Sequence, residues 1–499
     1  MLIQTLEKHA AASGADIALQ GSDNVLNYAD LWTEINRVST YFNELPQAVL
    51  SLAMDNHPAW VVTDLAAMTC NIPLVPLPLF FSDSQLLHAM LDAGITTLLT
   101  DQPERFSQIL GDFIVQKSTL IIAGKRLMQY DVRIPTKKLP TKTAKITYTS
   151  GTTGNPKGVC LSTEAMLNVA QSIALQVNVH SGCRHLCILP LSTLLENVAG
   201  VYASLLAGAT VHVLPSDKTG LSGSKLNIEK LHSALLQTQA NTAILIPELL
   251  NALVLALETG AIKESRGKLP HLRFLAVGGA HVSKNLLERA KQLDLPVFEG
   301  YGLSESASVV ALNTAQACKI GSVGKPLPHI AIQFSEDNEI LVKGSNLLGY
   351  TGTNSAEMTG DFIKTGDIGY MDDDGFLFIN GRKKNIFITS FGRNVSPEWV
   401  ESSLLNSSYI LQACVFGEAK PFNVAVIVTK ADSTPILIYK AIEAINQLLP
   451  DYARISKWVL ADTPFAVKNG QLTLNGRMKR DVILQAYQQK INDLYKEAA

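Results

Sequence analysis

One stretch of the sequence decides how the rest is interpreted: Tyr148-Thr149-Ser150-Gly151-Thr152-Thr153-Gly154-Asn155-Pro156-Lys157-Gly158. It follows a short strand candidate at residues 145–148 and combines three glycines, four Ser or Thr hydroxyls and one lysine. Glycines let backbone N–H groups approach a polyphosphate, hydroxyls add hydrogen-bond donors and the lysine adds positive charge. It differs from the common P-loop, which has Ser or Thr directly after the lysine. The stretch predicts a phosphate-binding loop whose contacts come from Thr149, Ser150, Gly151, Thr152, Thr153, Gly154 and Lys157.

Around this loop lies a chain of 499 residues, which is too long for a single hydrophobic core, so we expect at least two domains. Hydrophobic residues make up 47% and charged residues 17%, proportions typical of a globular protein and not of a disordered or coiled-coil one. The 42 Lys and Arg residues nearly balance the 44 Asp and Glu residues, without long blocks of one sign. This balance argues against a surface for nucleic acid or anionic membranes.

The six cysteines are dispersed, and only Cys183 and Cys187 lie close together. Because no second pair and no histidine stands at metal-ligand spacing, we interpret the cysteines as reduced structural thiols. The first eight residues lack the basic start and apolar stretch of a signal peptide. The most apolar long segment, residues 242–257, contains polar residues and a proline and is typical of a strand entering a helix. We therefore expect a cytoplasmic protein with no integral membrane segment.

Short apolar runs alternate with segments of helical period through the first three quarters of the chain. The strand candidates are residues 49–54, 119–122, 186–189, 210–214, 243–246 and 272–277. One helix should begin after Ser283 and another after Ser396, each with the serine as its N-cap. The alternation predicts an α/β fold of layered, largely parallel sheets and helices, with ligands at the carboxyl ends of the strands. Residues 375–395 are a candidate linker, and the residues after them suit a small α+β domain.

The glycine-rich stretch closely resembles the signature of the adenylate-forming superfamily, which includes acyl-CoA synthetases, peptide-synthetase adenylation domains and beetle luciferases. Further motifs that resemble those of the superfamily follow in the correct order over residues 145–480, which is more specific than any single motif. They are Gly278-Gly279-Ala280, Tyr301-Gly302-Leu303-Ser304-Glu305, Thr365-Gly366-Asp367 and Gly381-Arg382-Lys383-Lys384-Asn385.

The resemblance implies a role for each motif. Gly278, Gly279 and Ala280 would form a turn beside the adenine and acyl groups. Tyr301 would pack on the adenine, Ser304 would meet the α-phosphate, and Glu305 would hold Mg²⁺. Gly302 belongs to the same motif. Asp367 would bind the ribose.

These roles agree with the chemistry of the side chains. A carboxylate such as Asp367 can accept hydrogen bonds from both ribose hydroxyls. Glu305 offers the hard oxygen ligand that Mg²⁺ prefers. Arg382 could reach the ribose or a phosphate. Taken alone, each would be interpreted as an ordinary turn or helix-start charge.

Two positions depart from the superfamily pattern. Its C-terminal loop usually places a lysine after a glycine, whereas here Arg477 follows Gly476. Arginine stays charged and can donate to two oxygens, but its head group is larger. We assign the catalytic role to Arg477, keep Lys479 as the alternative, and leave open the loss of the first half-reaction. The Asn-Gly-Arg variant also resembles some bacterial long-chain acyl-CoA synthetase-like proteins.

The second departure lies at residues 190–197, which line the acyl pocket in relatives and here carry Thr193 where an aromatic residue or histidine is common. Amino-acid-activating relatives have an aspartate in this region, and this segment has none. An apolar pocket could not satisfy an ammonium group, so an apolar acid, with a fatty acid as the expected class, is favoured. The predicted pocket comprises Thr193, Leu194, Leu195 and Gly278, with Val198 and Val201 nearby.

The resemblance also implies a two-step reaction. ATP with Mg²⁺ would activate a carboxylic acid as acyl-AMP with release of pyrophosphate, and the acyl group would pass to CoA or to phosphopantetheine on an acyl carrier protein. A large N-terminal domain, residues 1–383, would hold the ATP and acyl sites. A small mobile domain, residues 384–499, would rotate about Lys384, withdraw Arg477 and bring the loop at Gly392 to the thiol.

Three alternatives to a CoA ligase remain open at this point. The chain could be a ligase or loading domain that serves a carrier protein. It could be a pseudoenzyme that binds nucleotide or acyl groups, because of Arg477 and Thr193. A luciferase-like oxidative activity is also known in the superfamily, but nothing in the sequence favours it.

Overall fold

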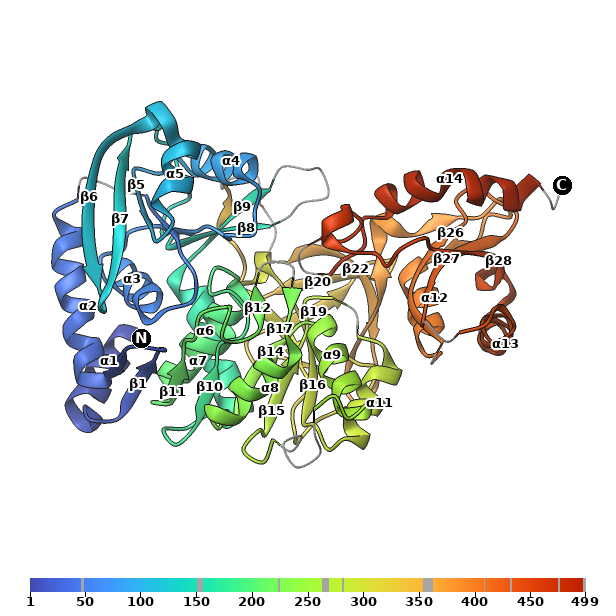
Figure 1. The fold of residues 1–499 in the computed structure, drawn as a ribbon, viewed down its shortest axis with the longest axis horizontal. Coiled ribbons are helices and arrows are strands. Elements are labelled where there is room, and N and C mark those ends of the chain that lie inside the picture. Colours follow the sequence, from blue (N-terminus) through green and yellow to red (C-terminus); the bar gives the residue numbers. More distant parts are fainter. Residues whose placement is uncertain are drawn as a thin grey trace.

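The structure is a computed structural model that describes residues 1–45, 49–149, 156–222, 225–262, 269–280, 282–352, 362–407, 409–430, 433–473 and 476–496. Figure 1 shows a large N-terminal part built around two broad sheets, and a smaller C-terminal part, coloured orange to red, that packs beside it. The architecture is therefore the expected α/β fold with a large N-terminal domain and a smaller C-terminal one.

The first broad sheet has eight strands. β3, β4, β5 and β8 form its parallel centre, and the other strands join it in antiparallel fashion. In order across the sheet the strands are β21 (Gly349–Tyr350), β9 (Lys157–Leu161), β8 (Lys145–Thr149), β4 (Leu74–Pro76), β3 (Leu50–Ala53), β5 (Thr97–Thr100), β7 (Lys125–Val132) and β6 (Ile114–Ile122).

The second broad sheet has nine strands, with parallel pairing from β1 through β11, β10, β14 and β15 to β16. In order the strands are β18 (Lys325–Pro326), β17 (Ser308–Leu312), β16 (Val297–Leu303), β15 (Phe274–Val277), β14 (Thr242–Leu245), β10 (Arg184–Leu186), β11 (Thr210–His212), β1 (Ile17–Gln20) and β2 (Val25–Asn27). The expectation of largely parallel sheets therefore holds for the sheet centres, while antiparallel strands flank them.

A four-stranded antiparallel sheet leads from the large part toward the small one: β19 (Ala331–Phe334), β20 (Glu339–Lys343), β22 (Ile363–Met371) and β23 (Leu377–Arg382). The C-terminal part contains the hairpin of β24 (Phe387–Ile388) and β25 (Asn394–Val395) and a sheet of β26 (Ile410–Phe416), β27 (Asn423–Thr429) and β28 (Ile455–Leu460). A short hairpin of β12 (Leu221–Ser222) and β13 (Lys225–Leu226) lies in the large part.

Helices cover the sheets (Figure 1). The described α-helices are α1 (Leu2–Ser13), α2 (Tyr28–Asn43), α3 (Pro58–Thr69), α4 (Asp83–Ala93), α5 (Pro103–Leu110), α6 (Thr163–Gln176), α7 (Ala203–Leu206), α8 (Ile228–Gln237), α9 (Pro247–Glu258), α11 (Lys284–Gln292), α12 (Pro397–Leu405), α13 (Pro435–Asn446) and α14 (Arg480–Lys496). The 3₁₀-helices are η1 (Gly111–Phe113), η3 (Ser304–Ser306), η5 (Lys383–Asn385), η6 (Asp451–Ala453) and η7 (Val467–Asn469), and η2 (Glu196–Tyr202) is a π-helix.

Local sequence signals correctly predicted several of these elements. Residues 242–257 form β14 and then α9, which has Pro247 at its start, and Ser283 caps α11 by accepting a hydrogen bond from the N–H of Leu286. Ser396 precedes α12 as expected but does not cap it with its side chain, because its hydroxyl donates to the carbonyl of Asn380 on β23 instead.

Two strand predictions were inexact. The predicted strand at 186–189 ends at Leu186, because the N–H groups of Ile188 and Leu189 donate to the buried carboxylate of Glu196. The candidate at 119–122 is the end of the long antiparallel strand β6, outside the parallel alternation.

Two expectations about the whole chain can be compared with the structure. The six cysteines form no disulfide. Among the residues that the structure describes, no helix has the length and apolar character needed to cross a lipid bilayer.

A buried ion pair joins three elements at the centre of the large part. Lys145, the first residue of β8, donates to Asp64 on α3 at 2.9 Å, and both side chains are about 3% exposed. Asp64 also accepts from Asn197 and from the hydroxyl of Tyr202, both on the π-helix η2, at 2.9 and 2.7 Å. Lys145 additionally donates to these same two residues. The strand that leads to the glycine-rich loop is thereby fixed to the π-helix.

Removing the cation from this network should destabilise the large part. We expect Lys145→Met to lower the free energy of unfolding, measured by urea titration, by about 3 kcal/mol, because Asp64 would remain buried without its counter-ion. Lys284→Met is the matched control, since Lys284 lies at the exposed start of α11 and pairs with Glu288 at 3.8 Å. That control should change stability by less than about 0.5 kcal/mol. Equal effects of the two substitutions would contradict a structural role for the network.

Candidate active site

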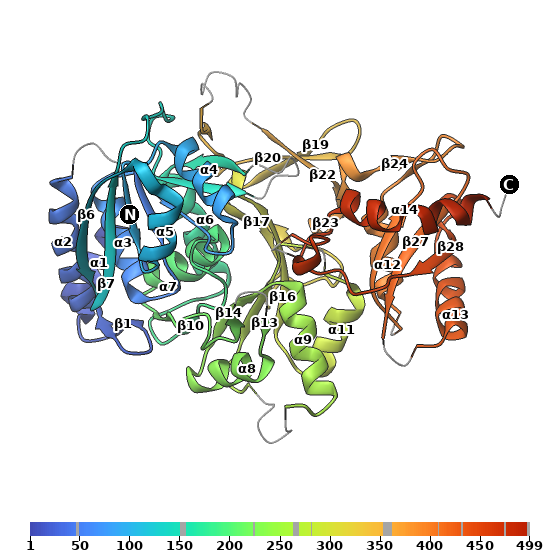
Figure 2. The same ribbon diagram turned by 45° about the horizontal axis from the view of Figure 1, so that its top comes forward.

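Most of the predicted site residues that the structure describes meet in one cleft between the carboxyl end of the nine-stranded sheet, the four-stranded sheet and the C-terminal part. Figure 2 shows the segment before α14, in red, extending from the C-terminal part toward β16 and β23. The cleft is lined by Lys157, Gly278, Gly279, Ala280, Tyr301, Gly302, Ser304, Glu305, Asp367, Arg382, Lys384, Arg477 and Lys479. These residues come from distant parts of the chain, so folding assembles them as the motif order implied.

Asp367 is the centre of a hydrogen-bonded group. It lies on β22 and is about 3% exposed. One carboxylate oxygen pairs with Arg382 Nε at 2.6 Å, and the other accepts from the hydroxyl of Tyr301 at 2.6 Å. Burial raises the pKa of Asp367, and the Arg382 guanidinium opposes that shift. Burial and the Asp367 carboxylate together raise the pKa of Tyr301, which therefore stays a hydrogen-bond donor.

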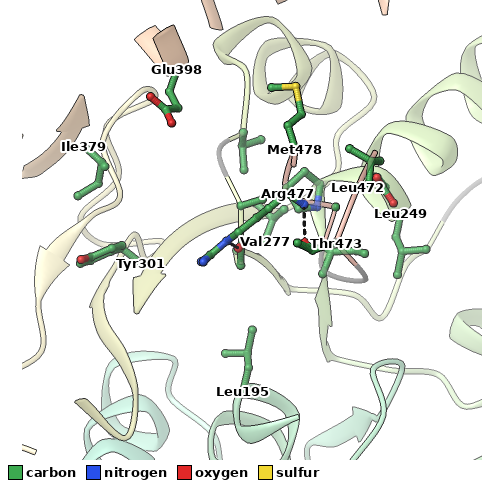
Figure 3. A pocket seen from close by; sticks show the side chains of 18 of the residues that line it. Leu195, Leu249, Val277, Tyr301, Ile379, Glu398, Leu472, Thr473, Arg477 and Met478 are labelled. Atoms are coloured by element: carbon green, nitrogen blue, oxygen red, sulfur yellow. Dashed lines mark hydrogen bonds between the residues drawn. The ribbon is translucent and has the colours of Figure 1, made fainter. Parts of the chain in front are cut away.

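Arg477 reaches into this cleft from the C-terminal part. Its Nε donates to the carbonyl of Gly279 at 3.2 Å, and its backbone N–H donates to the hydroxyl of Thr473 at 3.0 Å. In Figure 3 its guanidinium points toward Tyr301, and Leu195 lies across the cavity on the chain just before η2. The Gly279 turn and the Asp367 group therefore face the same cationic side chain.

The loop that carries Arg477 is held on the C-terminal part by a bidentate ion pair. Arg480, at the start of α14, donates through Nη1 and Nη2 to the two oxygens of Glu401 at 2.6 and 2.5 Å. Glu401 is about 2% exposed and also accepts from the backbone of Val415. Two parallel charge-assisted hydrogen bonds fix orientation as well as distance. This pair anchors the segment three residues beyond Arg477.

Three cations converge on the cleft. Burial and the nearby guanidinium of Arg382 lower the pKa values of both Arg477 and Lys384. Arg477 also contributes to the lowered pKa of Lys384. Of these three cations, Arg382 pairs directly with the Asp367 carboxylate. The arrangement can therefore accept an anion that neutralises several positive charges at once.

Glu305 lies in η3 and lines the same cleft. Its carboxylate accepts from the hydroxyl of Tyr350 at 3.2 Å, and Lys157 Nζ lies 6.0 Å from the centre of the Tyr350 ring. The Glu305 carboxylate shares the cleft with Lys157 and is a hard oxygen ligand of the kind that fits a magnesium ion with waters and nucleotide oxygens as its other ligands. Ser304 begins the same turn. Gly302 lies so close to the carbonyl of Ser308 that a side chain would not fit there.

Most of the predicted phosphate loop lies outside the described residues: Ser150, Gly151, Thr152, Thr153 and Gly154. The ends of the loop are described. Thr149 ends β8, whose Tyr148 hydroxyl donates to Asp92 on α4 at 2.9 Å, and Asp92 also accepts from Thr351. No motif in the sequence pointed to Asp92 or Thr351, because they act by holding the loop ends from separate elements.

The predicted acyl segment lies at the inner wall of the same cavity. Thr193, Leu194 and Leu195 line it, and the Thr193 hydroxyl donates to the carbonyl of Pro190. Asn56, which sequence reasoning missed, fixes this segment by donating to the carbonyl of Leu189 and accepting from the N–H of Leu191. Asn56 lies more than 130 residues upstream, so only the tertiary structure relates it to the pocket.

Two predicted residues are placed differently from the others. Lys479 is exposed and lines the cleft, but Arg477 is the residue in contact with the Gly279 turn. Gly392 lies in the exposed β24–β25 hairpin with a positive φ of 72°, and it does not line the cleft. In this orientation the C-terminal part therefore presents Arg477 to the cleft and keeps the hairpin tip at Gly392 outside it.

Comparison with known proteins identifies the family of the chain. The AMP-binding enzyme family model matches residues 6–349, and the model of the AMP-binding enzyme C-terminal domain matches residues 384–499. A long-chain-fatty-acid–CoA ligase of Mycobacterium bovis is 27% identical over 87% of this chain and 86% of its own length. A 2-succinylbenzoate–CoA ligase of Bacillus pumilus is 28% identical over 80% of this chain and 82% of its own length.

Solved structures share the fold over nearly the whole chain. The anthranilate CoA ligase AuaEII in complex with anthranoyl-AMP superposes with a TM-score of 0.81, at 17% identity, covering 97% of this chain and 96% of that one. The o-succinylbenzoate CoA synthetase of Bacillus subtilis in complex with ATP and a magnesium ion gives a TM-score of 0.74, at 24% identity, covering 96% and 98%. With the family model matching more than half of its residues, the chain belongs to the AMP-binding enzyme family of the adenylate-forming superfamily, and it is related to AMP-forming CoA ligases.

Proposed function

We propose that this enzyme activates an apolar carboxylic acid as acyl-AMP and then transfers the acyl group to CoA. The observation that carries the proposal is the position of Arg477, which touches the Gly279 turn and faces the Asp367–Tyr301–Arg382 group in one cleft. In the proposed reaction a carboxylate attacks the α-phosphate of ATP, and a cation beside the nucleotide reduces the repulsion between these two anions.

The nucleotide would be held by groups on both sides of the cleft. Asp367 offers its oxygens to the ribose hydroxyls, and Tyr301 offers a ring beside the Gly279–Ala280 turn for the adenine. The phosphates would extend toward Lys157 and the glycine-rich stretch. Glu305 would hold Mg²⁺, which when bound neutralises phosphate charge and orients the leaving group.

The residues of the chain assist the first half-reaction mainly by charge and position. A carboxylate oxygen of the acid attacks the α-phosphorus in line, the bond from that phosphorus to the bridging oxygen breaks, and pyrophosphate leaves with the electron pair. Arg477 reduces the repulsion between the incoming carboxylate and the α-phosphate. Ser304 adds a hydroxyl donor toward the α-phosphate. No proton has to be transferred in this step.

The second half-reaction requires a different orientation of the C-terminal part. The thiol of CoA attacks the carbonyl carbon of the acyl-AMP, AMP leaves, and the thiol proton passes to solvent. We propose that residues 384–499 rotate about Lys384, so that Arg477 leaves the cleft and the hairpin at Gly392 approaches it. Both sequence relatives are named as CoA ligases, which supports CoA as the acceptor in preference to a carrier protein.

The first prediction concerns Arg477. We expect Arg477→Ala to lower the rate of Mg²⁺-dependent ATP–pyrophosphate exchange by about 100- to 1000-fold, the usual cost of removing one charge-stabilising donor from an active site. Arg477→Lys should recover part of the loss. Lys479→Ala is the control and should leave exchange unchanged. If the Lys479 variant lost exchange and the Arg477 variant kept it, the assignment of the catalytic cation would be wrong.

The second prediction concerns Asp367. We expect wild-type enzyme to discriminate against 3′-deoxy-ATP relative to ATP by about tenfold in kcat/KM, because a charge-assisted hydrogen bond to the ribose is lost. In Asp367→Asn the discrimination should fall toward unity, while the KM for the acid stays near the wild-type value. Steady-state kinetics with both nucleotides measures the ratio. Unchanged discrimination in the variant would place the ribose elsewhere.

The third prediction concerns the hinge. Lys384→Pro fixes φ at the proposed hinge and should spare ATP–pyrophosphate exchange while depressing acyl-CoA formation. Lys384→Ala removes the charge but leaves the backbone free, so it should keep the wild-type ratio of the two rates. Both rates can be measured on the same preparation, by isotope exchange and by thiol consumption. Equal loss of both half-reactions in the proline variant would contradict the two orientations.

A further inference from the structure

Two hydrophobic cores of the large part are neighbours, and the residues at their junction are not fully buried. One core contains Phe274, Ile173 and Val198, and the other contains Ile244, Leu245 and Val277. Leu195, Ala199 and Ala276 pack against both cores and yet remain only partly buried. Protein cores normally close-pack at such a junction. Partial burial of small residues there indicates space between the sheet and the helices that cover it.

The strand register gives the direction of this space. Alternate residues of a strand share a face, so Phe274 and Ala276 of β15 lie in line with Gly278, the residue that follows the strand. Beside them on β14 stand Ile244, paired with Ala276, and Thr242, paired with Phe274. Gly278 lies at the mouth, next to the Gly279 carbonyl that accepts from Arg477. The four-residue step from Gly278 to Phe274 measures about 13 Å.

The space continues past Phe274. Ile173, Val177 and Val179, at the carboxyl end of α6, line the same cavity as Arg477. Phe274 stacks on Phe298 with ring centres 4.7 Å apart, so its ring forms a side wall. We refer to the path lined by Leu195, Ala199, Ala276, Phe274 and Ile173 as the acyl tunnel. A carboxylate placed at Arg477 would have its alkyl chain directed down this path.

Three polar side chains beside the tunnel, those of His185, Thr242 and Glu196, are hydrogen-bonded to one another or to the backbone. His185 Nδ1 lies 2.9 Å from the Thr242 hydroxyl and its Nε2 lies 2.8 Å from Glu196. The other oxygen of Glu196 accepts from two backbone N–H groups. Although the ligand atoms of His185, Cys187 and Glu196 lie within 4.8 Å of one another, these bonds identify them as a structural group.

Charge in the tunnel is also informative. No Lys or Arg stands among the described residues that line it from Leu195 to Val179. A second carboxylate at the far end of a substrate would therefore be buried without a counter-ion, which is strongly unfavourable. The walls favour an unbranched hydrocarbon chain over a dicarboxylic acid.

We infer that the acyl tunnel selects an unbranched long-chain fatty acid, and that Ala276 and Ala199 determine specificity because their small side chains let the alkyl chain pass. This inference rests on the proposed function and names its substrate class. An extended chain of about ten carbon atoms reaches the level of Phe274. Longer chains continue to Ile173 and Val177 at the end of α6.

The test measures ATP–pyrophosphate exchange of the full-length enzyme with butanoate, octanoate, dodecanoate, hexadecanoate and dodecanedioate. Wild-type kcat/KM should rise with chain length to dodecanoate or beyond, and dodecanedioate should be at least about 100-fold poorer than dodecanoate. In Ala276→Leu the ratio of dodecanoate to butanoate should fall by about 100-fold, the equivalent of about four methylenes excluded from the tunnel. Ala199→Leu, from the opposite wall, should lower the same ratio.

The matched control is Ala174→Leu. Ala174 is a similarly part-buried alanine on α6 that packs against the first core but does not line the cavity, so its variant should keep the wild-type ratio. Exchange that prefers dodecanedioate, or an unchanged ratio in both tunnel variants, would overturn the inference while leaving the proposed function intact.

A binding measurement separates the tunnel from the chemistry. Displacement of the fluorescent fatty acid cis-parinaric acid by dodecanoate should weaken in Ala276→Leu and not in Ala174→Leu. If no acid supported exchange but this pattern held, the tunnel would stand and the proposed activity would fail. If dodecanoate displaced the probe equally from all variants, the tunnel would be wrong.

Discussion

The placement of the two substrate regions depends on one buried carboxylate, Asp64. It accepts from Lys145 on β8 and from Asn197 and Tyr202 on the π-helix η2. β8 leads to the glycine-rich stretch, and η2 carries a wall of the acyl tunnel. A buried ion pair adds little net stability over apolar packing, but its directional bonds restrict how the elements can be arranged. The network therefore serves position more than stability, and it fixes β8 and η2, which lead to the proposed phosphate and acyl sides, relative to each other.

The cleft has an excess of positive charge that a nucleotide would balance. Arg382, Lys384 and Arg477 approach one another, and the lowered pKa values of Lys384 and Arg477 express the cost of bringing cations together in a partly buried site. An anionic ligand removes that cost. Nucleotide binding would then favour one orientation of the C-terminal part. Of these three cations, Arg477 is the one that would move with that part, because Arg382 precedes the proposed hinge and Lys384 is the hinge itself. Arg480 and Glu401 fix its loop to the C-terminal part, so in the proposed rotation the loop would move together with that part.

Substitution of the usual lysine by Arg477 has a structural counterpart. Its guanidinium donates one hydrogen bond to the Gly279 carbonyl and has further N–H groups for the substrate. A lysine ammonium could also make several bonds, but its flexible stem would hold them in a less fixed geometry. The residue also lies opposite Leu195, at the entrance to an apolar path. Arg477 would therefore lie beside the carboxylate of the acid, at the point where its hydrocarbon chain enters the proposed tunnel.

The sequence alone determined the α/β class, the family, and the identity of the residues around the cleft, since motifs such as Tyr301 to Glu305 and Thr365 to Asp367 carry their chemistry in short contiguous runs. It also predicted α9 and α11 from Pro247 and Ser283, because such signals are local. It did not predict the early end of β10 at Leu186, the use of Ser396 as a donor to Asn380, or the roles of Asn56 and Asp92. Those features depend on partners from other elements of the chain.

Arg477 was one of two candidates in the sequence, and only the tertiary structure placed it, rather than Lys479, on the Gly279 turn. The course of the acyl tunnel was likewise decided by strand register and by the way two cores meet, because spacing along a chain carries no information about the empty space between side chains.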